Sequence, residues 1–183
     1  VPEANIIAVE SELTQAQKYY LDELVERSDA IKSGSVDPSR DNMLKITGEA
    51  RKLAIDMRLI DPAYTLADNQ KILQVVDNVE RIYRDGAEDK ATQMIFSDIG
   101  TPKSKEEGFD VYNELKALLV DRGIPKEEIA FVHDANTDDK KNSLSRKVNS
   151  GEVRILMAST EKGGTGLNVQ SRMKAVHHLD VPW

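Results

Sequence analysis

The sequence predicts an α/β protein in which a parallel β-sheet is flanked by helices. In the second half of the 183-residue chain, short apolar runs of strand length alternate with amphipathic helical segments. Such alternation produces parallel strands joined by right-handed crossovers. In the first third of the chain, apolar residues recur at helical spacing, which predicts a helical segment preceding the sheet.

The N-terminal part contains helical stripes separated by turn residues. Two stripes come first, formed by Leu13, Ala16, Tyr20 and Leu24 and by Met43, Ile46, Ala50, Leu53 and Met57. Ser33-Gly34-Ser35 predicts a turn between these two helices, and Asp61-Pro62 should end the second. A third helix is expected to run to about residue 86, with its apolar face formed by Ile72, Val76, Val79 and Tyr83.

Four short strands are expected after these helices, and each leads into polar residues. The strands are predicted over 93–97, 129–133, 153–158 and 174–179. Between the first three, helices are expected over 111–119, closed by Gly123 and Pro125, and over 138–149. Ligands of parallel sheets bind beyond the carboxyl ends of the strands. The polar residues that follow the strands should therefore share one edge.

Composition limits the classes of protein to consider. The formal net charge is −7, which argues against strong independent nucleic-acid binding because phosphate neutralisation needs a basic surface. The chain contains no Cys, so disulfides and thiolate metal sites are excluded. No apolar run has membrane-spanning length and no signal peptide is recognisable, so no membrane partner and a cytoplasmic location are expected. The ending Val181-Pro182-Trp183 follows an apolar stretch, which predicts a cut from a longer chain.

The glycine-rich segment after the third strand points most directly to a ligand. It reads Ser159-Thr160-Glu161-Lys162-Gly163-Gly164-Thr165-Gly166-Leu167-Asn168. A strand followed by hydroxyl side chains, glycines and an amide side chain is an arrangement that brings the backbone close to phosphate groups in α/β proteins. A Walker loop is excluded because Lys162 precedes the glycines and Leu167 follows Gly166, and the dinucleotide fingerprint has a different glycine spacing. A plain turn is the open alternative.

This segment resembles motif V of superfamily-two helicases, and is most similar to the Swi/Snf-type DNA translocases. Gln93-Met94-Ile95-Phe96-Ser97 resembles motif IV, and Asp180-Val181-Pro182-Trp183 resembles the Asp-x-x-Trp that leads into motif VI. The resemblance covers residues 70–183 and, more loosely, 10–62. Within the family it is closest to a bacterial, phage and plasmid branch whose helicase regions often adjoin an adenine methyltransferase domain.

The resemblance implies half of a motor. Residues 67–183 would form the C-terminal RecA-like lobe, truncated before motif VI, and residues 1–66 a helical segment that precedes or packs on it. In the intact parent, ATP and Mg²⁺ bind between this lobe and a missing N-terminal RecA-like lobe while the motor moves on DNA. The resemblance therefore implies no catalytic residue in this chain, no ATP or Mg²⁺ bound to it and no ATPase activity from it alone.

The resemblance also implies roles for individual residues. The expected nucleic-acid contacts are Ser97, Thr137, Ser159, Thr160 and Lys162, and the expected nucleotide contacts are Gly164, Gly166 and Asn168. Lys162 departs from the family pattern but could reach a phosphate. Purely structural roles stay open as alternatives, since Thr160 could cap a turn and Asn168 could cap a helix.

A metal site is not expected, because His177 and His178 point to opposite faces of a strand. Two other functions stay open. One is a non-catalytic α/β interaction module that uses its N-terminal helices as a docking surface. The other is a free-standing nucleotide-binding domain. Titration with ATP would distinguish it from half of a motor, because half of an ATP cleft should bind ATP weakly or not at all. A motif VI of the form Arg-x-x-Gln-x-x-Gly-Arg after Trp183 would decide for the motor.

Overall fold

The computed structural model describes residues 5–103, 107–164 and 166–180, and it has the predicted α/β architecture. Its centre is a four-stranded parallel sheet in the order β2-β3-β1-β4. The strands are β1 (Thr92–Phe96), β2 (Ile129–Phe131), β3 (Ile155–Ala158) and β4 (Met173–His178). Thr165 of the glycine-rich segment and residues 181–183 of the Asp-x-x-Trp ending lie outside the described residues.

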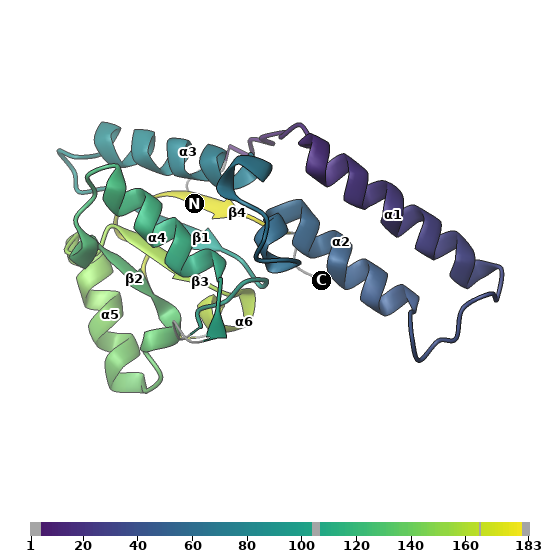
Figure 1. Cartoon of the computed structure of the whole chain (residues 1–183). Helices are drawn as coiled ribbons and strands as arrows, with labels where there is room; N and C mark the ends of the chain where they lie inside the picture. The colour runs from purple at the N-terminus through teal and green to yellow at the C-terminus, as the bar shows by residue number, and fades with distance from the viewer. Residues whose placement is uncertain (1–4, 104–106, 165, 181–183) are drawn as a thin grey trace.

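Helices precede the sheet and alternate with its strands (Figure 1). The α-helices are α1 (Gln15–Lys32), α2 (Met43–Ile55), α3 (Lys71–Asp85), α4 (Val111–Asp121), α5 (Asp138–Ser150) and the single turn α6 (Thr160–Gly163). Short 3₁₀ turns are η1 (Met57–Leu59), η2 (Leu66–Asp68), η4 (Lys126–Glu128) and η5 (Val132–Asp134). The predicted order of helical segment first and sheet second is confirmed.

Helices cover both faces of the central strands β1 and β3. On one face, α3 and α4 pack against β1 and β3 in a core that includes Ile72, Val79, Leu115, Leu119, Ile95 and Ile155. On the other face, α5 packs against the same strands through Leu144 and Val148, which meet Leu156 and Ala158. Both faces of β3 are covered, which explains why its four residues form an unbroken apolar run.

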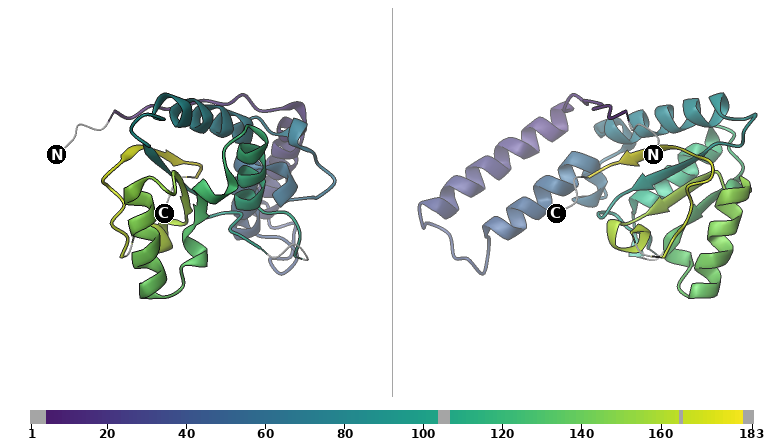
Figure 2. Two further views of the ribbon diagram at one scale, coloured as in Figure 1. Left: turned by 90° about the vertical axis from the view of Figure 1, so that its left-hand side faces the viewer. Right: turned by 180° about the vertical axis from the view of Figure 1, so that it is seen from behind.

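The first two helices form an antiparallel pair at one side of the sheet (Figures 1 and 2). The buried Gln17 amide donates to the carbonyl oxygen of Leu53 (2.9 Å), which joins α1 to α2. Farther along the pair, Arg27 of α1 forms ion pairs with Asp41 and Glu49. Strand β4 points toward α2, so the pair stands at the carboxyl edge of the sheet.

Several element boundaries differ from the prediction, among them the start of β3, which begins at Ile155 rather than at residue 153, and the ends of α2 and β2. Helix α2 ends at Ile55 rather than at Asp61-Pro62, because the buried Asp56 carboxylate accepts the main-chain N–H of Arg58 (2.9 Å) and starts a 3₁₀ turn. Strand β2 ends at Phe131, and the next three residues form η5. Ile55 packs in the same core as α3 and α4, so the helical segment is anchored on the sheet through its end.

Candidate functional site

The residues that follow β1 and β3 lie side by side at the carboxyl edge of the sheet. The main-chain N–H of Ser97 donates to the carbonyl oxygen of Ala158 (3.0 Å). The main-chain N–H of Thr160 donates to Oδ1 of Asp98 (2.6 Å). Together these bonds join the two loops, so Ser97 and Thr160 share one edge, as parallel strands require.

The Ser97 side chain is turned into the protein. Ser97 is 2% exposed, and its hydroxyl donates to the carbonyl oxygen of Ile99 (2.8 Å). Its own carbonyl oxygen accepts the hydroxyl of Tyr112 on α4 (2.6 Å). Ser97 therefore holds the loop after β1 in place. A contact between its hydroxyl and nucleic acid stays a prediction, and it requires the bond to Ile99 to be exchanged.

Ser159 and Thr160 open a helical turn rather than an irregular loop. The Ser159 hydroxyl accepts the main-chain N–H of Lys162 (3.3 Å) and so caps α6. This role leaves Ser159 buried, whereas Thr160 and Lys162 are exposed. Of the three predicted nucleic-acid contacts after β3, Thr160 and Lys162 are thus the two that a ligand could reach directly.

Thr137, the predicted contact after β2, is also exposed. Its hydroxyl accepts the main-chain N–H of Lys140 (3.3 Å) and caps α5. Capping uses the acceptor capacity of the hydroxyl and leaves its proton as a donor. Thr137 therefore combines a structural role at the start of α5 with a position at the predicted edge.

The second half of the glycine-rich segment leads away from Thr160. Gly164 is the C-cap residue that follows α6, and Gly166 adopts a left-handed conformation with φ of 75°. The carbonyl oxygen of Asn168 accepts the side-chain amide of Asn149 (2.7 Å), which lies in the last turn of α5. Helix α5 starts at the carboxyl edge of the sheet and ends at the amino edge. Asn168 therefore lies near the amino edge, at the opposite end of the strands from Thr160.

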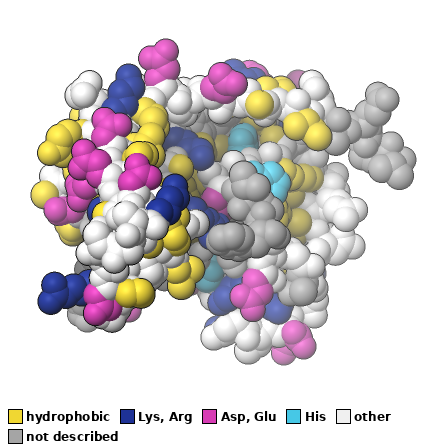
Figure 3. Space-filling view, turned by 90° about the vertical axis from the view of Figure 1, so that its right-hand side faces the viewer, with side chains coloured by type: hydrophobic (Ala, Val, Ile, Leu, Met, Phe, Trp, Pro, Cys, Tyr) yellow, Lys and Arg dark blue, Asp and Glu magenta, His cyan; other side chains and the backbone are white. Residues whose placement is uncertain are grey.

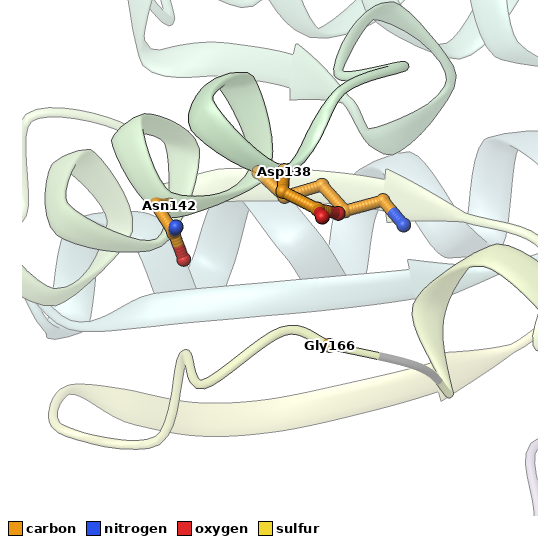
Figure 4. A pocket seen from close by; sticks show the side chains of 4 residues that line it. Asp138, Asn142 and Gly166 are labelled. Carbon is orange, nitrogen blue, oxygen red and sulfur yellow. The ribbon is translucent and has the colours of Figure 1, made fainter.

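Two surface hollows lie between α5 and the segment that follows β3. The first has a volume of about 370 Å³ and is lined by Asp138, Lys141, Asn142 and Gly166. Figure 4 shows Asp138 and Asn142 on α5, across the hollow from Gly166. The second has a volume of about 300 Å³ and is lined by Val132, Ala135, Asn136, Lys141, Glu161 and Lys162. Lys141 borders both.

Charges of both signs surround these hollows. Lys141 and Lys162 are accompanied by Asp138 and Glu161, so the region is not uniformly basic. Burial lowers the pKa of His133, and the positive charge of Lys162 lowers this pKa further. The imidazole is therefore neutral near pH 7 and adds no positive charge to the site.

Three residues of this edge were not singled out as site residues from the sequence. Asp98 and Asp180 belong to the polar residues that follow the strands. Lys141 lies in a helix whose charged residues are typical of a solvent-exposed face. The signal for the two aspartates was their position at the carboxyl ends of parallel strands. Their partners are 62 and 82 residues away in the chain, which local patterns cannot show.

Within the described parts of the chain, no group of three or more His, Asp or Glu side chains is placed to hold a metal ion. None of the helices described there is long and apolar enough to cross a membrane. Comparisons with protein-family models, with curated proteins and with solved structures found no match.

Proposed function

We propose that this chain is the second motor lobe of an ATP-dependent DNA translocase. In this role it supplies contacts to a strand phosphate and one wall of the ATP cleft. The observation that carries the proposal is the division of the segment after β3. Thr160 lies at the carboxyl edge beside the loop of Ser97, while Asn168 lies at the far end of α5. A single segment can thus contact two different ligands.

The Thr160 end has the chemistry of a phosphate contact. Thr160 and Lys162 are both exposed, two positions apart in the same turn, and together they offer a hydroxyl donor and an ammonium group. Lys141 borders the adjoining hollow from α5. Hydroxyl and ammonium donors are the groups that position a nucleic-acid backbone without reading its sequence.

The Gly166 end has the chemistry of a ribose contact. Ribose hydroxyls donate to carboxylate and amide oxygens, which Asp138 and Asn142 present at the first hollow. Gly166 is exposed and lets a ligand approach the backbone closely. Asn168, two residues later, is also exposed and lies toward the other end of α5. In the proposed motor, the first lobe would complete the binding site for ATP and Mg²⁺, and this chain would contact only the ribose of ATP.

The charge distribution limits how strongly this chain binds DNA by itself. Its net charge is −7, and the candidate edge mixes lysines with carboxylates. Affinity that depends on a few phosphate contacts falls steeply as salt is added. The expected behaviour of the isolated chain is therefore weak, salt-sensitive binding, with tight binding only when the first lobe contributes its own contacts.

The test is an NMR titration of ¹⁵N-labelled protein with a single-stranded oligonucleotide, and with a duplex of the same sequence, at low salt. We expect the main-chain amides of Thr160 and Lys162 to shift, and those of α1 to stay in place. Added salt should reverse the shifts. If the oligonucleotide moves no resonance near Thr160, the proposed nucleic-acid contact is wrong.

A second function is favoured by a separate observation on the helical pair. Tyr19 and Val25 on α1 are 72% and 53% exposed, and Leu44 on α2 is 84% exposed. Figure 3 shows hydrophobic side chains interspersed with charged ones on the side of the molecule that carries these helices. Such a surface suits a non-catalytic interaction module that docks a protein partner through α1 and α2.

The docking function has its own test. A photo-reactive amino acid in place of Leu44 should cross-link a discrete partner in cells, whereas the same group in place of the partly exposed Val120 on α4 should not. Cross-linking from position 44, together with an oligonucleotide titration that leaves Thr160 undisturbed, would favour docking over the motor.

A further inference from the structure

A chain of polar contacts connects helix α2 to the first residue of α6. It begins at Asp180, two residues after the end of β4. The Asp180 carboxylate lies 3.9 Å from the guanidinium of Arg51 on α2. The same carboxylate accepts the main-chain N–H of Asp98 at 3.0 and 3.2 Å. Asp98 in turn accepts the main-chain N–H of Thr160 at 2.6 Å. Four elements of the fold are joined in this way.

The Asp180 carboxylate is well placed to hold its partners. Its side chain is only 8% exposed, and that of Arg51 is 26% exposed, so the ion pair is shielded from solvent more than a surface pair. Lys71 of α3 is a second cation near Asp180. Burial lowers the pKa of Lys71, and the Asp180 charge opposes this effect. Asp180 is thus a buried anion between cations from two helices.

We propose that Asp180 and Asp98 are positioning residues through which helix α2 sets the place of Thr160. Arg51 attracts the Asp180 carboxylate across 3.9 Å. Asp180 accepts the main-chain N–H of Asp98, and Asp98 accepts the main-chain N–H of Thr160. The docking of α2 at the carboxyl edge therefore contributes to holding the loop that starts α6. This inference rests on the proposed function where it concerns nucleic acid, because Thr160 is the predicted phosphate contact.

The arrangement has a consequence for regulation. Helix α2 belongs to the projecting helical pair, and Asp180 contacts it at the side to which β4 points (Figures 1 and 2). A movement of the pair that separates Arg51 from Asp180 would loosen Asp98 and release the Thr160 amide. Binding events on the helical pair would in this way change the phosphate contact without touching it.

The first measurement follows the Thr160 amide by NMR in the whole chain. Asp180→Ala should move its resonance and accelerate its hydrogen exchange by about tenfold, the change expected from losing one hydrogen bond of typical strength. Asp180→Asn keeps an oxygen for the Asp98 amide and should restore much of the wild-type signal. Arg51→Gln should produce a smaller change in the same direction. The matched control is Asp134→Ala, which removes a carboxylate at the same edge after β2.

The variants separate the possible outcomes. If Asp98→Ala moves the Thr160 resonance but Asp180→Ala does not, Asp98 acts alone and the relay is wrong. If none of them moves it, the contact itself is wrong. A melting curve for each variant identifies any that fails to fold, and Asp180→Asn and Arg51→Gln then provide the comparison.

The second measurement is the affinity for the oligonucleotide at low salt. Asp180→Ala should weaken it several-fold while Asp134→Ala does not, because the Thr160 hydroxyl loses its fixed position. Equal affinity despite a displaced Thr160 resonance overturns the positioning role. If the wild-type chain binds no oligonucleotide, the proposed function fails and the role toward nucleic acid fails with it, while the NMR result still decides whether the relay exists.

Discussion

Gly163 packs so closely against Phe96 that a β-carbon at residue 163 would lie 2.6 Å from the Phe96 ring. The same β-carbon would lie 2.9 Å from that of Ala158 and 3.0 Å from the end of Met94. Phe96 ends β1 and Gly163 ends α6. One glycine of the segment that reads as a ligand loop is therefore required by packing, because α6 lies directly on the sheet.

This contact predicts that Gly163→Ala destabilises the protein. Inserting a methyl group into a packed site costs about 1–3 kcal/mol, and the rigid neighbour Ala158 cannot rotate away. Urea denaturation measures the change in the free energy of unfolding. The control is Gly48→Ala in α2, where the added β-carbon meets nothing within 4 Å. There the substitution should stabilise by about 0.5–1 kcal/mol. Equal effects at the two positions would refute the packing argument.

His177 predicts that stability falls in mildly acidic solution. Burial lowers the pKa of His177 from 6.5 to about 4, and the charge of Arg81 adds to this effect. Its Nε2 lies 2.9 Å from Oε1 of Gln93. Between these two pKa values the unfolded state binds more protons than the folded state. The contribution is therefore complete above pH 6.5 and is lost as the pH falls toward 4.

The loss from His177 should reach at most about 3 kcal/mol, which follows from 1.36 kcal/mol per pKa unit. The free energy of unfolding, measured by urea denaturation at several pH values from 4 to 7, gives the slope. His177→Gln removes the titrating group and should flatten it. An unchanged slope in the variant would assign the pH dependence to the carboxylates instead.

Thr160→Val is expected to impair coupling to DNA. It removes the hydroxyl donor at nearly constant volume and keeps the main-chain bond to Asp98. A lost hydrogen bond to a charged group costs about 1.5–3 kcal/mol. In the polypeptide that joins this lobe to a first lobe, DNA affinity and DNA-stimulated ATP hydrolysis should fall, with ATP affinity nearly unchanged. Thr47→Val on α2 is the control. Weaker ATP binding with normal DNA binding would reverse the assignment.

Asn168→Ala is expected to have the opposite pattern. Its side chain is exposed at the far end of α5, away from Thr160, and its structural bond is made by its main-chain carbonyl, which the substitution keeps. The concentration of ATP needed for half-maximal hydrolysis should rise, while DNA affinity stays nearly the same. Gln170→Ala removes an exposed amide two residues later and serves as the control. A similar rise for both variants would show that Asn168 has no special contact.

The pattern of apolar residues was enough to predict the architecture. The stripe of Ile72, Val76 and Val79 predicted α3, and all three are buried. The apolar run from Ile155 to Ala158 predicted the strand β3, and all four residues are buried. Burial of apolar side chains is the main driving force of folding, and its period differs between helix and strand. These features are local, so they can be read directly from the chain.

Tertiary structure decided what the site residues do. Ser97 precedes a polar loop and looks available, yet its hydroxyl donates to Ile99 and its carbonyl accepts Tyr112. The glycines after Thr160 suggest a loose turn, but Gly163 is needed by its contact with Phe96. The link from Asp180 through Asp98 to Thr160 joins residues 62 and 82 positions apart. Such partners are chosen by which strand ends meet in space, because hydrogen bonds depend on distance and direction rather than on sequence period.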